Sequence, residues 1–182
     1  RGLPVVIVAS FGSTTYKLVA NPGVMDLRGK VVGTSRIGST TDFALRRALM
    51  RLGLTPDRDV KILATGIGEA DKRIILMLQG RMDGTIGSPE SILAAETQAK
   101  VKLETLADLE EMKIYNTVGD LSTRTDFLKN RRDLLRQFFM ASAEAIALGK
   151  KNKALVLKII GKQMKVTDRK RLDVVYEASL GK

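Results

Sequence analysis

The stretch that decides the fold is KVVGTSRIGSTTDFALRRALMRLGL, residues 30–54. It opens with a short, largely β-branched apolar run, residues 30–35, which predicts a strand. Gly53 stands where a following helix would end, after leucines that recur at helical spacing: Leu45, Leu49 and Leu52. A strand joined to a helix by a short polar turn is the unit from which parallel sheets are built. The stretch therefore predicts a parallel sheet covered by helices.

The same alternation continues downstream as far as residue 100. Residues 59–65 and 84–87 predict further strands, and residues 70–79 and 90–100 predict the helices that follow them. The connections are short, as in a βαβ series. Upstream, residues 3–9 predict a buried strand, residues 13–20 a second strand, and residues 25–29 a short turn of helix.

After residue 125 the character changes from α/β to helical. Residues 115–122 predict one more strand, and residues 126–148 predict a single long amphipathic helix. Its buried side is expected to carry Phe127, Leu134, Leu135, Phe138, Ala141 and Ala145. Asn152 and Thr167 are predicted to cap two more helices.

Composition limits the chemistry open to this chain. It has 182 residues, of which 44% are hydrophobic, and it contains neither His nor Cys. The usual neutral-pH base and the commonest transition-metal ligands are therefore missing, and no carboxylate pair has a spacing that invites a metal. We expect no cofactor, no metal and no catalytic residue.

The positive charge is concentrated in one segment. The net charge is +11, and residues 149–171 carry nine Lys or Arg against one acid, Asp168, which gives 9 − 1 = +8. Nucleic-acid binding normally adds aromatic side chains for stacking, and none interleaves with these lysines. We therefore expect no nucleic-acid partner and interpret the segment as a solvated helix surface, with weak attraction to an anionic membrane as the lesser alternative.

The turn between the first predicted βα pair is the best candidate for a binding site. At the carboxyl edge of a parallel sheet, a helix start offers N–H groups and a favourable dipole to an anion. Gly38 would let a ligand approach the backbone closely, and hydroxyls and one guanidinium surround it: Ser35, Arg36, Ser39, Thr40 and Thr41. An ordinary capped helix start with solvated hydroxyls is the alternative.

Ser10 and Ser88 follow other predicted strands, and a plain turn or cap is the alternative for each.

Two glycine-rich stretches do not bind nucleotides. Five residues separate Gly23 from Gly29 and Val31 follows Lys30, which breaks the P-loop pattern, and Gly66 and Gly68 lack the third glycine of a dinucleotide site.

The order of these segments resembles a family. Residues 27–33, the serine-rich turn with its helix at 35–54, and residues 60–63 are similar to solute-binding proteins of the nitrate, sulfonate and taurine type, with their pyrimidine-precursor synthase relatives. Residues 78–84, Ser88-Pro89 and the helix from residue 125 extend the likeness, although Asn130-Arg131 stands where Asn-Pro is common.

The resemblance implies a three-layer α/β/α lobe of the periplasmic-binding-protein type II fold, with a mostly parallel sheet and an all-helical tail. Residues 1–9 would be a crossing hinge strand, 10–122 the second lobe, and 123–182 a tail returning to a first lobe whose amino-terminal part is missing. Ser35, Gly38, Ser39, Thr40 and Thr41 would contact the ligand, with Ser10 and Ser88 at the cleft floor.

The implied function is the non-enzymatic receptor of an ABC importer, which binds a small polar or anionic solute and docks on the importer's membrane subunits. Its location would be periplasmic or membrane-anchored outside the cytoplasm. Two alternatives remain: the effector domain of a LysR-like regulator, which the helical tail argues against, and a synthase relative, which would depend on His and Cys residues that this chain lacks.

Overall fold

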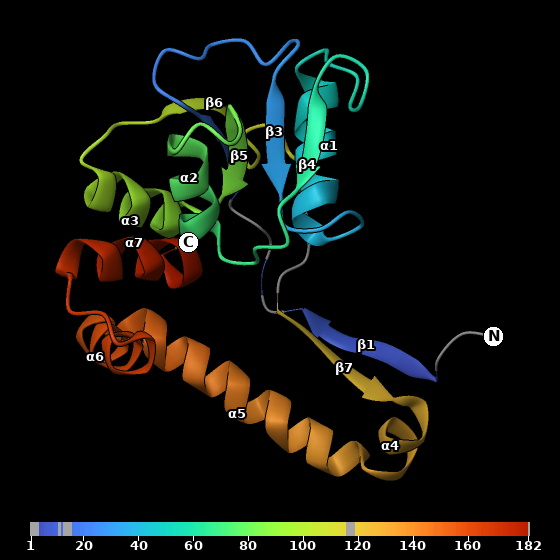
Figure 1. Cartoon of the computed structure of the whole chain (residues 1–182). Helices are drawn as coiled ribbons and strands as arrows, with labels where there is room; N and C mark the ends of the chain where they lie inside the picture. The colour runs from blue at the N-terminus through green and yellow to red at the C-terminus, as the bar shows by residue number, and fades with distance from the viewer. Residues whose placement is uncertain (1–3, 11, 13–15, 116–118, 182) are drawn as a thin grey trace. The chain divides into compact units, whose positions relative to one another are not determined.

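The fold was analysed in a computed structural model of the chain, which describes residues 4–10, 12, 16–115 and 119–181. Its contacts divide the chain into two compact units: residues 14–116 form one, and residues 1–13 with 117–182 form the other (Figure 1). The division into lobe, hinge and tail stays a prediction.

The unit of residues 14–116 is built on a five-stranded mixed sheet with the strand order β4-β3-β5-β2-β6. The parallel part consists of β3 (Val31–Thr34), β4 (Lys61–Ala64) and β5 (Gly84–Gly87), with Val32 opposite both Ile62 and Gly84. The strands β2 (Lys17–Ala20) and β6 (Glu104–Asp108) complete the sheet in antiparallel register. The predicted parallel series is therefore confirmed for β3, β4 and β5.

Helices cover both faces of this sheet. The helix α1 (Thr40–Arg51) packs on one face, where its Leu45 and Leu49 share a core with Val32. On the other face lie α2 (Ala70–Leu78) and α3 (Pro89–Ala99), whose Ile74 and Ile92 form a second core. Alternate residues of a strand point to opposite faces, so adjacent β2 residues enter different cores. The predicted three-layer α/β class is confirmed.

The second unit is mainly helical. A two-stranded antiparallel pair, β1 (Val5–Ser10) with β7 (Asp120–Arg124), leads into α4 (Thr125–Asn130) and α5 (Arg132–Lys151). The chain then forms α6 (Lys153–Met164) and α7 (Arg169–Leu180), which pack on each other through Leu157, Leu172 and Tyr176. Asn152 caps α6 as predicted, since its side chain accepts from the N–H of Leu155 at 3.0 Å.

Several predicted elements are corrected. The single helix over residues 126–148 is two helices, because Arg131 (φ −131°, ψ 35°) leaves helical geometry between them. Asp168, not Thr167, caps α7, and residues 25–29 contain no helical turn. The strand β6 was not predicted, and β7 begins at Asp120 instead of residue 115. Parts of the predicted strands 3–9, 13–20 and 115–122 lie outside the described residues.

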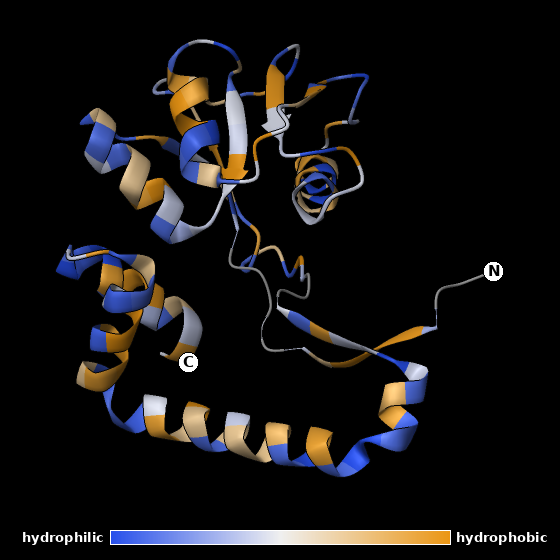
Figure 2. Ribbon diagram, turned by 60° about the horizontal axis from the view of Figure 1, so that its bottom comes forward, coloured by the Kyte–Doolittle hydropathy of each residue, from blue (hydrophilic) through white to orange (hydrophobic). Residues whose placement is uncertain are grey.

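The predicted burial of α5 and β1 is also wrong for this chain. Ile7 of β1 is 65% exposed, and Phe138 of α5 is 47% exposed. Only Leu135 and Gly149 of α5 are buried, although hydrophobic and hydrophilic residues alternate along the helix (Figure 2). The helix α5 is amphipathic, but no hydrophobic core formed by the described residues covers its apolar side.

Candidate functional site

Three parallel strands end at the carboxyl edge of the larger sheet, and polar residues follow each of them. The strand β3 ends at Thr34, and Ser35 begins its loop; β5 ends at Gly87, and Ser88 follows. The N–H of Thr65, after β4, donates to the carbonyl of Thr34 at 2.9 Å, which ties the ends of β3 and β4 together. This edge is where the sequence placed the binding turn.

The turn after β3 holds a cluster of hydroxyls, which we call the hydroxyl cluster: Thr34, Ser35, Ser39 and Thr41. Thr41 Oγ1 lies at its centre, 3.0 Å from Thr34 Oγ1, 2.8 Å from Ser35 Oγ and 3.0 Å from Ser39 Oγ. Ser35 and Thr41 are at least nine-tenths buried. The hydroxyls of the cluster therefore bond mainly to one another, and these hydrogen bonds fix the conformation of the turn.

Ser39 performs a second task as the N-cap of α1. Its side chain accepts from the N–H of Asp42 at 3.3 Å, and its hydroxyl lies 2.6 Å from the carbonyl of Arg36. A capping oxygen satisfies only part of the first turn, because helix starts leave four N–H groups without intrahelical partners. A helix start of this kind favours an anion through its backbone N–H groups and its dipole.

A buried carboxylate, that of Asp42, stabilises this helix start. Asp42 is 4% exposed, accepts from the N–H of Gly38 at 2.8 Å, and pairs with Arg46 Nε at 3.0 Å. Arg46 also donates to Asp57 at 2.6 Å, and this bond raises the pKa of Arg46. The positive charge of Arg46 offsets the negative charge of Asp42, which would otherwise repel an anion at the helix start.

A buried arginine crosses the same edge on the other face of the sheet. Arg73, in the first half of α2, is 1% exposed and donates to the carbonyls of Ile67 (3.0 Å), Gly68 (2.7 Å) and Ile86 (2.8 Å). Burial lowers the pKa of Arg73. No carboxylate pairs with it within the described ranges, so backbone carbonyl dipoles hold the charge. The hydrogen bonds of Arg73 thus hold the β4–α2 loop against the end of β5.

Ser88 is the N-cap residue of α3, although its side chain makes no capping hydrogen bond to the backbone. Ser88 Oγ bonds to Glu90 Oε1 and lies 3.1 Å from Ser91 Oγ, so it bonds within the first turn of α3. Tyr16 directly precedes β2, whose Lys17 pairs with Gly87 at the end of β5. Burial raises the pKa of Tyr16, while the charge of Arg73 acts in the opposite direction.

The structure brings some predicted site residues together and separates others. Ser35, Ser39 and Thr41 join one cluster, with Arg36, Gly38 and Thr40 exposed along the same turn. Ser10 belongs to the other unit, where its hydroxyl lies 3.4 Å from the carbonyl of Gly12. Which of these residues contact a ligand stays a prediction.

Sequence analysis missed the supporting residues Thr34, Arg73 and Tyr16. Arg73 carries a recognisable signal, because it precedes the buried Ile74 and lies one helical turn before the buried Met77. Thr34 lies near the end of an apolar strand, where a hydroxyl residue stands out from its neighbours.

The arrangement suits binding more than chemistry. Hydroxyls, N–H groups and a helix dipole at a sheet edge recognise a polar or anionic group without exchanging protons with it. Across the described residues, no group of three or more potential ligands could hold a metal ion. Nor is any helix there long and apolar enough to cross a membrane.

Comparisons with solved structures identify the class to which this fold belongs. The sulfonate-binding protein SsuA of Escherichia coli matches with a TM-score of 0.71 at 20% identity, over 97% of this chain and 59% of that protein. The alkanesulfonate-binding SsuA of Xanthomonas axonopodis pv. citri, solved with bound MOPS, matches with a TM-score of 0.73 at 16% identity, over 97% and 60%. The chain thus has the fold of periplasmic solute-binding proteins and spans about three-fifths of their length.

A family profile described as NMT1/THI5 like matches residues 1–152, which is most of the chain. The chain belongs to the NMT1/THI5-like family. A search of curated proteins found no match.

Proposed function

We propose that this chain is part of the solute-binding receptor of an ABC importer. It would bind a small polar or anionic solute, such as a sulfonate or nitrate, at the turn of residues 35–41. The hydroxyl cluster at the start of α1 carries the proposal, because it lies at the sheet edge where α/β proteins bind ligands. The likeness to sulfonate-binding proteins supports the same solute class.

The proposed role is binding and delivery without catalysis. The sequence offers no His or Cys for acid–base or thiol chemistry. Membrane subunits of the importer would be the protein partners, and the location would be outside the cytoplasm, as in the periplasmic relatives.

A thermal-shift screen of the full-length protein tests the proposal. The panel contains alkanesulfonates, MOPS, taurine, nitrate, aromatic carboxylates and pyrimidines. A ligand at about 100 times its dissociation constant adds roughly 2.7 kcal/mol to the free energy of unfolding, which raises the melting temperature by a few degrees. A shift with one chemical class supports the receptor and names its solute. A flat response across the panel would contradict it.

The contribution of the turn is measured with Ser39→Ala combined with Thr40→Ala. We expect the affinity for the identified solute to fall by about 1–3 kcal/mol, because two polar groups at the helix start are removed. Ser39 is also the N-cap, so the free energy of unfolding should fall by about 1 kcal/mol. Asn152→Ala is the matched control, since it removes the cap of α6 and should leave solute affinity unchanged. Equal affinities for all three proteins would refute the site.

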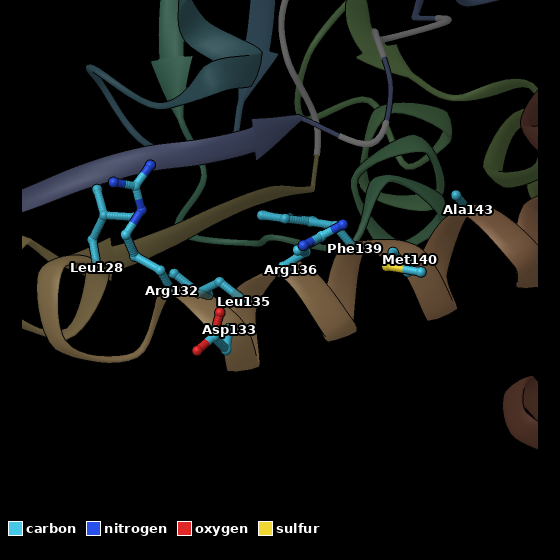
Figure 3. Close-up of a pocket in the computed structure, with 8 residues that line it drawn as sticks. All are labelled: Leu128, Arg132, Asp133, Leu135, Arg136, Phe139, Met140 and Ala143. Atoms are coloured by element: carbon cyan, nitrogen blue, oxygen red, sulfur yellow. The ribbon is translucent and has the colours of Figure 1, made fainter.

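We further propose that the exposed apolar side of α5 packs against another lobe of the whole protein. A hollow of about 560 Å³ lies along α4 and α5, lined by Leu128, Arg132, Asp133, Leu135, Arg136, Phe139, Met140 and Ala143 (Figure 3). Leu134, Phe138 and Ile146 are exposed on the same helix. Apolar surface of this kind usually marks an interface, and the relatives contain chain beyond the matched part.

Phe138→Ser distinguishes a covered face from an exposed one. In residues 1–182 alone, the substitution should change the free energy of unfolding by at most about 0.5 kcal/mol, as at any exposed site. In a longer natural form of the protein we expect a loss of about 3 kcal/mol, which is typical of a truncated buried aromatic side chain. Urea denaturation of both forms measures the difference, and equally small effects would show that nothing covers this face.

A further inference from the structure

One face of α6 exposes lysines and large apolar side chains together. Leu155, Lys158, Ile159 and Lys162 recur at helical spacing, and we call them the outward face of α6. Ile159 is 51% exposed and Leu155 is 36% exposed, and both lysines are exposed beside them. A solvated helix surface needs no exposed isoleucine between lysines, so this face differs from an ordinary polar one.

The orientation of this face is fixed by packing on the opposite side. Leu157 is 3% exposed and packs with Leu172 and Tyr176 of α7, and Val156 and Ile160 border the same cluster. Rotating α6 to hide Leu155 and Ile159 would expose this core. The outward face is therefore a stable surface of the folded unit.

The charge around the outward face stays largely uncompensated. Asp173 pairs with Lys153 at 3.2 Å and with Arg169 at 3.2 Å, and Glu177 pairs with Lys153 at 2.7 Å. Asp168 accepts from backbone N–H groups at the start of α7. Among the described residues, no ion pair forms at Lys158 or Lys162. The acids close in sequence thus pair with the edge of the segment and leave its face positive.

We infer that the outward face of α6 docks on an anionic lipid surface. Lysines attract the headgroups while the apolar side chains between them enter the boundary of the acyl chains, which is how amphipathic helices lie on membranes. Nucleic acid fits less well, because Tyr176, the one aromatic residue of α6 and α7, is 6% exposed and cannot stack on a base. The inference is independent of the solute site.

Sedimentation with lipid vesicles tests the inference on the purified protein. Vesicles with about one-quarter phosphatidylglycerol in phosphatidylcholine provide the anionic surface, and pure phosphatidylcholine vesicles provide the neutral one. We expect binding to the anionic vesicles alone, with a strong decrease as salt screens the lysines. Equal or absent binding to both vesicles overturns the inference. Competition by millimolar inorganic phosphate would overturn it in favour of a site for free anions.

Two variants separate the charged and apolar contributions. Lys158→Gln with Lys162→Gln should weaken binding to anionic vesicles roughly thirtyfold, at about 1 kcal/mol for each lysine near the surface. Ile159→Ser should weaken it several-fold and leave the salt dependence unchanged. Lys61→Gln with Lys100→Gln removes the same charge from exposed lysines of the other unit, and should have little effect.

The control variant with substitutions at Lys61 and Lys100 also gives results that would contradict the inference. If both lysine pairs lower vesicle binding equally, the attraction is general to a protein of net charge +11 and α6 has no special role. If the α6 pair lowers binding to a fluorescein-labelled single-stranded DNA and not to vesicles, the partner is a nucleic acid. Retained thermal stability of each variant shows that the fold is intact.

Discussion

Replacing Arg73 by methionine is expected to lower the free energy of unfolding by about 3–5 kcal/mol. Methionine keeps much of the length of the side chain but removes every donor, so the carbonyls of Ile67, Gly68 and Ile86 lose their partner in a buried place. Each buried carbonyl left without a hydrogen bond costs about 1–3 kcal/mol, reduced where water or a small shift supplies a new donor. Removal of a desolvated charge offsets part of this loss.

Urea denaturation of the variant measures this loss. Arg51→Met is the matched control, because it makes the same chemical change at an exposed position in the last turn of α1 and should alter stability by at most about 0.5 kcal/mol. Arg73→Lys should fall between the two, since one ammonium keeps the charge but cannot span three carbonyls. A loss below about 1 kcal/mol in Arg73→Met would show that the guanidinium does not hold the β4–α2 loop.

Local patterns predicted the central α/β part of the fold. The strand over residues 84–87 and the helix that ends before Gly53 are found where the sequence placed them, because an apolar run and a terminal glycine act within a few residues. The sequence also predicted the place of Ser35, Ser39 and Thr41 in the turn between β3 and α1, but not the hydrogen bonds that join their hydroxyls.

Features that depend on distant partners could not be predicted from such patterns. The strand β6 forms because Glu104 to Asp108 pair with β2, more than eighty residues earlier. Its alternation is weak, so only the partner reveals it. Phe138 fits the apolar side of an amphipathic helix, yet whether that side is covered depends on chain that packs there. Arg73 was overlooked because a charged residue in a helix is normally exposed.

The hydroxyl cluster also changes how the candidate site is understood. The sequence predicts that serine and threonine at this sheet edge contact the ligand, but Thr41 has three hydroxyl partners within the cluster. A group already satisfied gains little from a solute, whereas the exposed guanidinium of Arg36, which follows the end of β3, would gain more. The cluster is thus better suited to fixing the turn, and contact would come from its exposed rim.

The carboxylate beneath this turn gives the second large effect, which a double-mutant cycle measures. Arg46→Ala should lower the free energy of unfolding by about 2–3 kcal/mol, because Asp42 is buried and would lose its cation. Asp42→Ala should cost about 2 kcal/mol, since Gly38 loses its acceptor while Arg46 keeps Asp57 as a partner.

The double variant should cost only about 3 kcal/mol, which leaves a coupling energy of about 1–2 kcal/mol between the two residues. Arg46→Ala should lower the free energy of unfolding more than Asp42→Ala does. A buried carboxylate without a cation costs more than an arginine that still has a partner near the surface. Additive losses would mean that Asp42 and Arg46 act separately. If instead Arg46→Ala also weakens binding of an anionic solute while Asp42→Ala strengthens it, the pair sets the potential at the start of α1 as well as its shape.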